Sequence, residues 1–380
     1  MNSSRRSVLA TIAGASLVGL AGCFHDDTAA TLDSPVGEGD PDGTLEAPEN
    51  PISERRDEEP PSIDGAPPVT KEVPALAFNL DTFNDEAISG GVGQDGIPSI
   101  DNPDFIGPEN ANLDDGDPVF GIVHDGVVRA YPQSILVWHE IVNDTLGDTP
   151  LAITYCPLTG TAQAFERGGA EFGVSGRLVN SNLIMYDRTT DGWWPQVLAT
   201  GINGPLKGFQ LREHRMVWTT WKRWLVTHPD TEVLSENTGF ARSYNVDPYG
   251  SYNPAGGYYT SSSTMFSPLV SDDREHPKEI VIGSRTIDGA IAFNKELLSD
   301  EQVLSGAIGD QPFTAVWDDS LATGYIYANP DGASVTPVEA GYELDGSEYQ
   351  AVELPLDRSL GFDAMWFAWS GFYPHTQYVT

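Results

Sequence analysis

GDTPLAITYCPLTGTAQAFER (residues 147–167) aligns without a gap with GDQPFTAVWDDSLATGYIYAN (residues 309–329), at an offset of 162 residues. In both stretches two apolar runs flank a short turn, which is the pattern of two antiparallel strands. Internal similarity of this kind indicates that one structural unit occurs twice. Cys156 of the first stretch corresponds to Asp318 of the second, so we expect only the first unit to carry a site.

The similarity continues on both sides of these stretches. Upstream, DGVVRAY (125–131) matches DGAIAF (288–293) with one residue dropped. Three blocks in the same order predict two unequal copies of one unit, the first over 76–272 and a shortened second over 273–380. The downstream block consists of residues that recur at identical spacing: Trp221, Trp224, Pro229 and Thr231 against Trp366, Trp369, Pro374 and Thr376.

Short strands outnumber helices in the sequence pattern. Residues 119–131 contain two apolar runs around an Asp-Gly pair, the strongest short-range signal for a hairpin. Pro132 opens PQSILVWHEIVND (132–144), which we predict to be a helix with proline at its first turn. A second helix is predicted over 219–229. The predicted fold class is α+β, mostly short antiparallel strands with a few helices.

The N-terminus has the features of an export signal. Arg5 and Arg6 precede a short apolar stretch, and twin arginines in this position are typical of the route that exports folded proteins. LAGC (20–23) resembles a lipoprotein processing box. We therefore predict an export signal over 1–22, lipidation of Cys23 and a membrane anchor that holds the protein at the extracytoplasmic face of the cell membrane. An ordinary cleaved signal and an uncleaved anchor are the alternatives.

Residues 23–75 are rich in Asp, Glu, Pro, Gly, Ser and Thr and have almost no apolar periodicity. Such a composition cannot bury enough apolar surface to fold. We predict a disordered acidic tether between the anchor and the globular part.

The chain is strongly acidic, with a formal net charge of −36, and its basic residues are five Lys against fifteen Arg. An acidic, Lys-poor surface over a normal core is typical of proteins that work in molar salt, where screening removes self-repulsion. The alternative is an acidic surface for cationic ligands or divalent metals. Nucleic acid is excluded as a partner, because no basic stripe exists to neutralise phosphates.

Cys156 is the candidate catalytic residue. With Cys23 assigned to the anchor it has no disulfide partner, and it stands at a strand end just before a turn. His139 and Glu140 lie in an apolar segment, where a buried His beside a Glu suits a base or a metal ligand. If Cys156 and His139 meet, nucleophilic activation or copper or zinc ligation follows. The alternative is that both are ordinary core residues.

A polar segment, NSNLIMYDR (180–188), supplies further candidates. Asp187 is the tentative third catalytic residue, the alternative being a structural ion pair with its neighbour Arg188. The tentative binding residues are Tyr155, Glu140, Asn180, Asn182 and Arg188.

Residues 243–263 form a loop with five Tyr among Gly, Ser, Asn and Pro. Tyrosine with small polar neighbours suits carbohydrate or protein contact. The alternative is a plain surface loop.

Five blocks resemble an uncharacterised prokaryotic family, domain of unknown function 3179: YPQSILVWHEIVND, TYCPLTGTAQAF, FGVSGRLVNSNLIMYDR, HPDTEVL and DDREHPKEIVIG. The similarity runs from about residue 95 to the C-terminus. The resemblance implies no activity. Some members have a second cysteine three residues after the first, where this chain has Thr159, and that departure counts against a dithiol or a paired-cysteine metal site.

Two functions are compatible with these residues. The first is a cell-surface module of a halophile that binds a small molecule, a carbohydrate or a protein through the first unit and the loop 243–263. The second is a thiol-dependent enzyme, or a carrier of a soft metal such as copper or zinc, centred on Cys156 and His139. The sequence decides neither whether the protein is an enzyme nor which cofactor it holds. Convergence of Cys156, His139 and Asp187 on one pocket would favour the second function.

Overall fold

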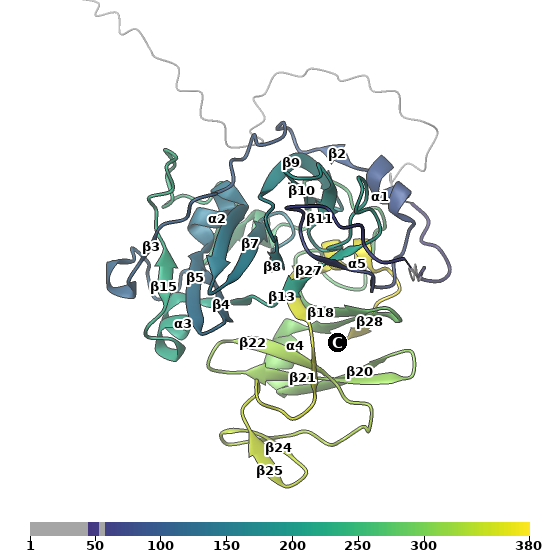
Figure 1. Ribbon diagram of the computed structural model, residues 1–380. Helices are drawn as coiled ribbons and strands as arrows, with labels where there is room; N and C mark the ends of the chain where they lie inside the picture. Colours follow the sequence, from purple (N-terminus) through teal and green to yellow (C-terminus); the bar gives the residue numbers. More distant parts are fainter. Residues whose placement is uncertain (1–44, 53–57) are drawn as a thin grey trace, which may run out of the picture.

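The computed structural model describes residues 45–52 and 58–380 (Figure 1). The predicted export signal, Cys23 and much of the predicted tether lie outside the described residues. Residues 69–75, which we expected to belong to a disordered tether, are instead packed on the protein. Val69–Thr70 (β1) pairs with Gln210–Leu211 (β12), and Val73 is buried in the core.

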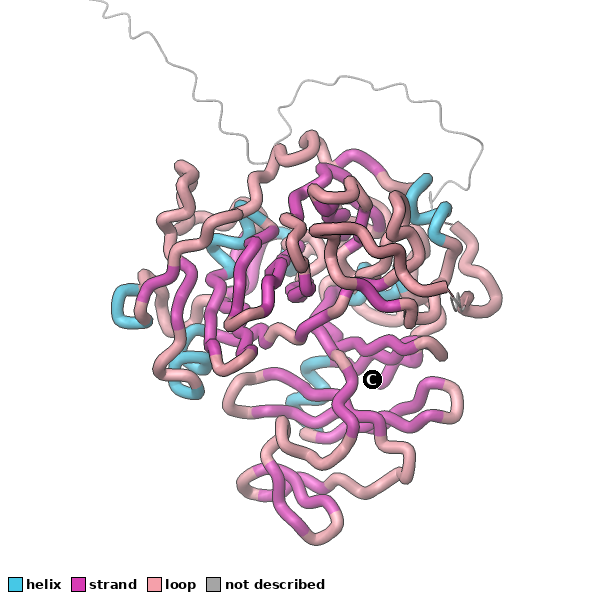
Figure 2. The backbone as a smooth tube through the Cα atoms, in the orientation of Figure 1, coloured by secondary structure: helices cyan, strands magenta, loops and turns pink. Residues whose placement is uncertain are grey.

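The chain folds into small, mostly antiparallel sheets with few helices, as the α+β prediction states (Figure 2). The helices are α1 (Leu80–Asp85), α2 (Gln133–His139), α3 (Trp221–Thr227), α4 (Lys295–Glu301) and α5 (Trp366–Phe372), with short 3₁₀ turns at Pro108–Asn110 and Tyr258–Thr260. Within the described part of the chain, no helix is long and apolar enough to cross a membrane.

The first unit contains two main sheets. One has the strand order β14 (Val217–Thr220), β4 (Pro118–His124), β5 (Val127–Pro132), β15 (Glu232–Leu234) and β3 (Phe105–Ile106). The other has the order β13 (Glu213–His214), β8 (Thr161–Glu166), β7 (Thr149–Cys156) and β6 (Ile141–Leu146).

The second unit has two sheets that repeat these strand orders and directions, except that β3 has no counterpart. The first is β27 (Gly361–Met365), β18 (Ile280–Thr286), β19 (Gly289–Asn294) and β28 (Gln377–Val379). The second is β26 (Asp357–Ser359), β22 (Thr323–Ala328), β21 (Gln311–Asp318) and β20 (Val303–Ile308). In each unit one strand, β15 or β28, runs parallel to the second strand of the hairpin, β5 or β19, while the other pairs of these sheets are antiparallel.

The repeated tryptophans occupy equivalent positions in the two units. The Trp224 indole N–H donates to Thr231 Oγ1 at 3.0 Å, and Trp369 donates to Thr376 in the same way at 3.0 Å. Each ring lies over a glycine of the adjacent strand, Gly121 or Gly283, where any Cβ would lie within 2.3 Å of the ring. This close packing explains why both the tryptophan and the glycine recur.

Three further groups of strands occur outside the repeated sheets. They are the sheet of β11 (Trp193–Pro195), β10 (Asn182–Asp187), β9 (Phe172–Val179) and β2 (Ile88–Ser89), the hairpin of β16 (Gly250–Tyr252) and β17 (Ala255–Gly257), and the sheet of β23 (Thr336–Val338), β24 (Gly341–Leu344) and β25 (Ser347–Tyr349). The β9–β10 pair and the β16–β17 hairpin belong to the first unit, and both lie against the end of β7.

The predicted hairpin at 119–131 is confirmed as β4 and β5, whose turn places Asp125 and Gly126 at positive φ. The predicted helix 132–144 is wrong in its second half. It ends at His139, Glu140 adopts a left-handed conformation with φ 58°, and Ile141 starts β6. Because β-branched side chains favour strands, Ile141 and Val142 pair with β7 rather than continue the helix.

The two units are in direct contact. In Figure 1, β27 of the second unit lies beside β8 of the first, and the Met365 N–H donates to the Thr159 carbonyl at 2.8 Å. Half-buried Arg215 of the first unit donates to the carbonyls of Gly361 and Gly324. The turn after β7 therefore lies at the junction of the units.

Candidate functional site

The end of β7 separates two regions of the core. Successive residues of a strand point to opposite faces, so Tyr155 and Cys156 lie on different sides of the sheet. Tyr155 packs in a cluster with Phe120 and Leu136, whereas Cys156 packs in another with Phe165 and others. Each side has its own polar groups.

The Cys156 thiol is fully enclosed. The side chain is 1% exposed, its Sγ lies 3.7 Å from the Ser181 carbonyl oxygen, and it accepts the Leu183 N–H at 3.4 Å. Burial, and then the nearby charge of Glu140, raises the pKa of Cys156 to about 11. The thiol is therefore protonated near neutral pH, which is the opposite of an activated nucleophile.

Glu140 stands on the same side of the sheet as the thiol. Its carboxyl is buried without a side-chain hydrogen bond to any described residue, and burial raises its pKa to about 8. It lines a small cavity of about 40 Å³ together with Leu158, Leu183 and Tyr249. Leu183, whose backbone N–H donates to the Cys156 Sγ, is one of the residues that line this cavity.

Lys278 completes this side of the site. Its side chain is 5% exposed, and Nζ has no hydrogen-bond partner among the described residues. Nζ lies 3.4 Å from the ring centre of Tyr258 and 4.5 Å from that of Phe367, and it interacts electrostatically with Cys156. The amine comes from the segment just before β18, so the second unit supplies it to the first unit's thiol.

His139 belongs to the other side of the sheet. Its Nδ1 lies 2.7 Å from the Pro98 carbonyl oxygen, which only accepts, so this nitrogen donates. Nε2 lies 2.7 Å from the Tyr244 hydroxyl and accepts a hydrogen bond from it. Burial lowers the pKa of His139 and keeps the ring neutral. With both nitrogens bonded on the Tyr155 side, the structure does not bring His139 to Cys156.

Asp187 is occupied at the far end of β10. Its carboxylate accepts the Thr190 N–H and hydroxyl, each at 2.6 Å, and the Trp194 indole N–H at 3.0 Å. These bonds hold the turn after β10. Asp187 therefore lies apart from the thiol, four residues along the strand from Leu183.

Arg188 forms no ion pair with its neighbour Asp187. Its guanidinium instead binds three other carboxylates, Asp95, Asp101 and Glu171. Burial by itself would lower the pKa of Arg188, but its interactions with Asp101, Tyr186 and Glu171 together raise it. The cluster is half-exposed and fastens β10 to the segment before β4.

Asn182 and Thr159 form a buried network behind the turn. Asn182 Nδ2 donates to Thr159 Oγ1 and to Gln196 Oε1, both at 3.0 Å, and its Oδ1 accepts the Val197 N–H at 2.9 Å. Thr159 thus has a defined structural partner. Asn180 accepts the Leu269 N–H at 2.6 Å and packs beside this network.

Among the described residues, no group of three or more His, Cys, Asp or Glu side chains could hold a metal ion.

On the Tyr155 side, a chain of polar groups leads outward. Gln133 Nε2 donates to Asp247 Oδ2 at 2.9 Å, and the Tyr259 hydroxyl donates to the same oxygen at 2.8 Å. The Tyr155 and Tyr252 hydroxyls lie 3.2 Å apart, and Tyr252 stacks on Tyr259 with ring centres 3.9 Å apart.

This polar chain opens into a cleft of about 570 Å³. Four carboxylates line it and no lysine or arginine does, while asparagine, glutamine, serine and tyrosine supply the other polar groups. The polar lining includes Asn112, Asp114, Asp117, Gln133, Glu236, Tyr244, Asn245, Asp247 and Tyr252.

The loop 243–263 packs inward instead of projecting into solvent. Tyr244 and Tyr259 are buried, and the Tyr258 hydroxyl donates to the Leu158 carbonyl at 2.8 Å. The loop covers the turn after β7 and at the same time forms one wall of the cleft. Its tyrosines therefore have a structural role in addition to the predicted contact role.

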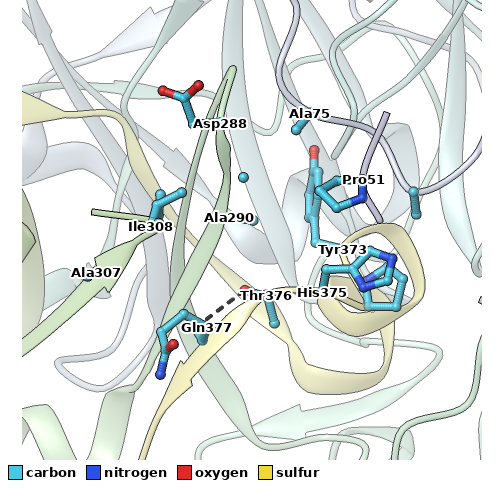
Figure 3. Close-up of a pocket in the computed structure, with 14 residues that line it drawn as sticks. Pro51, Ala75, Asp288, Ala290, Ala307, Ile308, Tyr373, His375, Thr376 and Gln377 are labelled. Atoms are coloured by element: carbon cyan, nitrogen blue, oxygen red, sulfur yellow. Dashed lines mark hydrogen bonds between the residues drawn. The ribbon is translucent and has the colours of Figure 1, made fainter. Parts of the chain in front are cut away.

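A second depression, of about 220 Å³, lies at the C-terminal edge of the second unit, between the β18–β19 turn and Tyr373–Gln377 (Figure 3). Backbone and small side chains make up much of its wall, and none of the predicted site residues lines it.

Sequence reasoning missed three important residues: Lys278, Gln133 and Asp247. A signal existed for Lys278, since it is one of only five lysines and directly precedes an apolar strand. No such signal marks Gln133 or Asp247, because only the folded loop brings them together.

Fold and site together define a β-rich protein of small antiparallel sheets, with an enclosed thiol and amine on one side of β7 and an acidic, tyrosine-lined cleft on the other. A family model described as a protein of unknown function (DUF3179) matches residues 94–376, well over half of the chain. The chain belongs to this family, as the resemblance predicted. No curated protein and no solved structure matches it.

Proposed function

We propose that the protein is a lipid-anchored binding module at the extracytoplasmic face of the cell membrane of a halophile, and that its ligand is a carbohydrate. The observation that carries this proposal is the cleft of about 570 Å³ beside the loop 243–263. Its volume is within the range of sites for small ligands.

The lining chemistry favours a polyhydroxylated ligand. Carboxylates accept hydrogen bonds from hydroxyls, side-chain amides both donate and accept, and tyrosine rings offer flat apolar surfaces. The cleft combines all three, for example in Asp117, Asn245 and Tyr252. The Asp247 carboxylate is already fixed by Gln133 and Tyr259, so this acceptor is preorganised.

The acidic lining would also attract a cation. In molar salt, however, the screening length is about 3 Å, which weakens attraction between a charged ligand and distant carboxylates. Direct hydrogen bonds to hydroxyls depend less on ionic strength. A neutral carbohydrate therefore fits both the cleft and the composition.

The location rests on the N-terminal residues. Arg5, Arg6 and LAGC (20–23) support export and lipidation of Cys23, and the acidic residues up to the globular part support a spacer between membrane and cleft. The low number of lysines and the charge of −36 support a halophilic source.

The thiol-dependent alternative is less well supported. It needs an activated Cys156, whereas burial raises the pKa of this thiol and His139 is bonded elsewhere.

We also propose that the two units arose by duplication of one ancestral unit. The aligned sequences, the matching strand orders and the paired Trp–Thr bonds support this proposal. The cleft then belongs to the first copy alone.

The experiment is calorimetric titration of the purified chain, in molar salt, with a panel of neutral oligosaccharides. Exposed Asn112 and Asn245 line the cleft without supporting the core, so Asn112→Ala and Asn245→Ala should each weaken binding by about tenfold. Asn102→Ala, at an exposed position outside the cleft, is the matched control and should not change affinity. The proposal fails if no member of the panel binds, or if the cleft variants bind as tightly as the control.

A further inference from the structure

Lys278 differs from every other lysine of the chain. The sequence has five lysines, and all five lie in the described residues. Four are paired with a carboxylate: Lys71 with Glu59, Lys207 with Asp81, Lys222 with Asp115 and Lys295 with Asp363. Lys278 alone is enclosed, and no described carboxylate pairs with it.

The surroundings of the Lys278 amine are mostly aromatic. Nζ lies over the faces of Tyr258 and Phe367, and the Tyr258 hydroxyl is turned away to donate to Leu158. The titratable groups around the amine are the thiol of Cys156, with Glu140 beyond it, and His276, whose Nδ1 accepts the backbone N–H of Lys278.

Such surroundings disfavour an ammonium. Aromatic faces attract a cation, but they do not replace the hydrogen bonds that three N–H donors lose on leaving water. Burial accordingly lowers the pKa of Lys278 to about 7. The neighbouring thiol does not offset this, because its own raised pKa keeps it uncharged. About half of the Lys278 side chains therefore carry a free electron pair at neutral pH, when ordinary lysines carry almost none.

We propose that Lys278 is the reactive amine of a second site, at the junction of the two units, which binds small uncharged aldehydes as an imine. This site is separate from the carbohydrate cleft and does not depend on it. An uncharged, desolvated lysine is the form that condenses with carbonyl compounds.

The reaction conserves atoms and electrons. The Nζ electron pair attacks the aldehyde carbon, forming the C–N bond while the C=O π electrons move to oxygen. The two N–H protons then leave with that oxygen as one water molecule, and a C=N bond remains. No oxidant or reductant is consumed. The product is neutral at Nζ, so it removes the unpaired charge from the aromatic surroundings.

The size of the site limits the aldehyde. The Lys278 side chain is only 5% exposed, and its Nζ packs against the rings of Tyr258 and Phe367. An amine enclosed in this way admits only the smallest aldehydes, of one or two carbons.

The test uses the full chain in high salt at pH 7, with acetaldehyde as the probe and cyanoborohydride to reduce any imine to a stable ethyl-lysine. Peptide mapping then compares all five lysines of the same molecule. We expect Lys278 to be modified at least tenfold faster than each of the other four. Its rate should fall below pH 7 and level off above it. Lys278→Met should lose that modification and leave the other four unchanged.

Because the mapping is internal to the wild-type chain, it does not require that a variant folds. Modification of the four paired lysines with Lys278 untouched until the protein is unfolded would overturn the proposal. So would a Lys278 rate that keeps rising to pH 10, as for an ordinary lysine. Loss of carbohydrate binding in the cleft variants, with Lys278 still reactive, would support two separate sites.

Discussion

The turn after β7 and the turn after β21 are equivalent in sequence and topology, yet their surroundings are opposite. Residues 156–160 are all buried, and the first turn holds Cys156 and Thr159. In the second turn, Asp319 and Ser320 are exposed, and Asp318 accepts the N–H groups of Ser320 and Leu321 within its own turn. One turn is enclosed by the protein, and the other is a solvent-exposed connection.

The difference comes from what each unit adds to the shared framework. The first unit inserts the β9–β10 pair and the loop 243–263, and both cover the turn after β7. The second unit contributes Lys278 and Phe367 to that same turn and leaves its own turn open. Two units with the same framework thus differ through the segments added to each, and the residues at equivalent positions have different surroundings.

The largest effect is expected where the buried turn depends on its polar network. Asn182→Ala removes the partners of Thr159 Oγ1, Gln196 Oε1 and the Val197 N–H, all in the core. Each unsatisfied buried group costs about 1 kcal/mol or more, so we expect a loss of about 3 kcal/mol in the free energy of unfolding. Guanidinium titration in high salt measures it. A loss below about 1 kcal/mol would mean that the network does not hold the turn.

A smaller, pH-dependent effect is expected at Glu140. The equivalent residue of the second unit is Gln302, which likewise has positive φ and ends its helix. The folded protein raises the pKa of Glu140 to about 8, above its unfolded value of about 4.3. This group therefore stabilises the fold fully below about pH 4, and its contribution is lost as the pH rises through 8.

Glu140→Gln should therefore stabilise the protein relative to the wild type by about 2 kcal/mol at pH 9 and have little effect at pH 5. Thermal unfolding at the two pH values measures the difference. An equal effect of the substitution at both pH values would show that the Glu140 carboxyl is not desolvated.

The smallest effect is expected from a reciprocal exchange at the last turn residue. Gly160 has φ 57° and its equivalent Ala322 has φ 51°, so both stand in the left-handed region. Gly160→Ala should destabilise by about 1 to 2 kcal/mol, because a Cβ would lie 3.3 Å from Met365 in addition to the backbone strain. Ala322→Gly relieves that strain in an open turn and should stabilise by up to about 1 kcal/mol. Effects of equal size and opposite sign would mean that the surroundings of the two turns do not matter.

The strands of the repeated hairpins could be predicted from the sequence, whereas the end of the helix that begins after Pro132 could not. The repeated hairpin motif and the Asp-Gly turn predicted the strands correctly, because turn chemistry and apolar alternation are local. The helix from Pro132 was predicted too long, since an apolar segment gives no clear signal where a helix changes into a strand.

Which residues come together in the candidate site depends on the face of the sheet to which each side chain points. Tyr155 and Cys156 are neighbours in sequence but lie in different clusters, and His139 follows Tyr155 rather than Cys156. Lys278 reaches Cys156 only because the second unit packs on the first, over a separation of more than a hundred residues. Contacts of this kind depend on tertiary packing and have no local pattern.

The most direct test of the contrast between the two turns is the rate of thiol alkylation against pH, measured with iodoacetamide in molar salt on two proteins. One has Cys156 as its only thiol, through Cys23→Ser. The other carries Cys23→Ser, Cys156→Ser and Asp318→Cys, which places the thiol at the equivalent, half-buried position. At pH 8 we predict that Cys156 reacts about a hundredfold more slowly than the thiol at 318, since its pKa is raised to about 11 against about 8.5 for a free thiol. Unfolding should abolish the difference. Equal rates in the folded proteins, or a Cys156 midpoint below 8.5, would contradict a buried, neutral thiol and restore the case for an activated nucleophile at the end of β7.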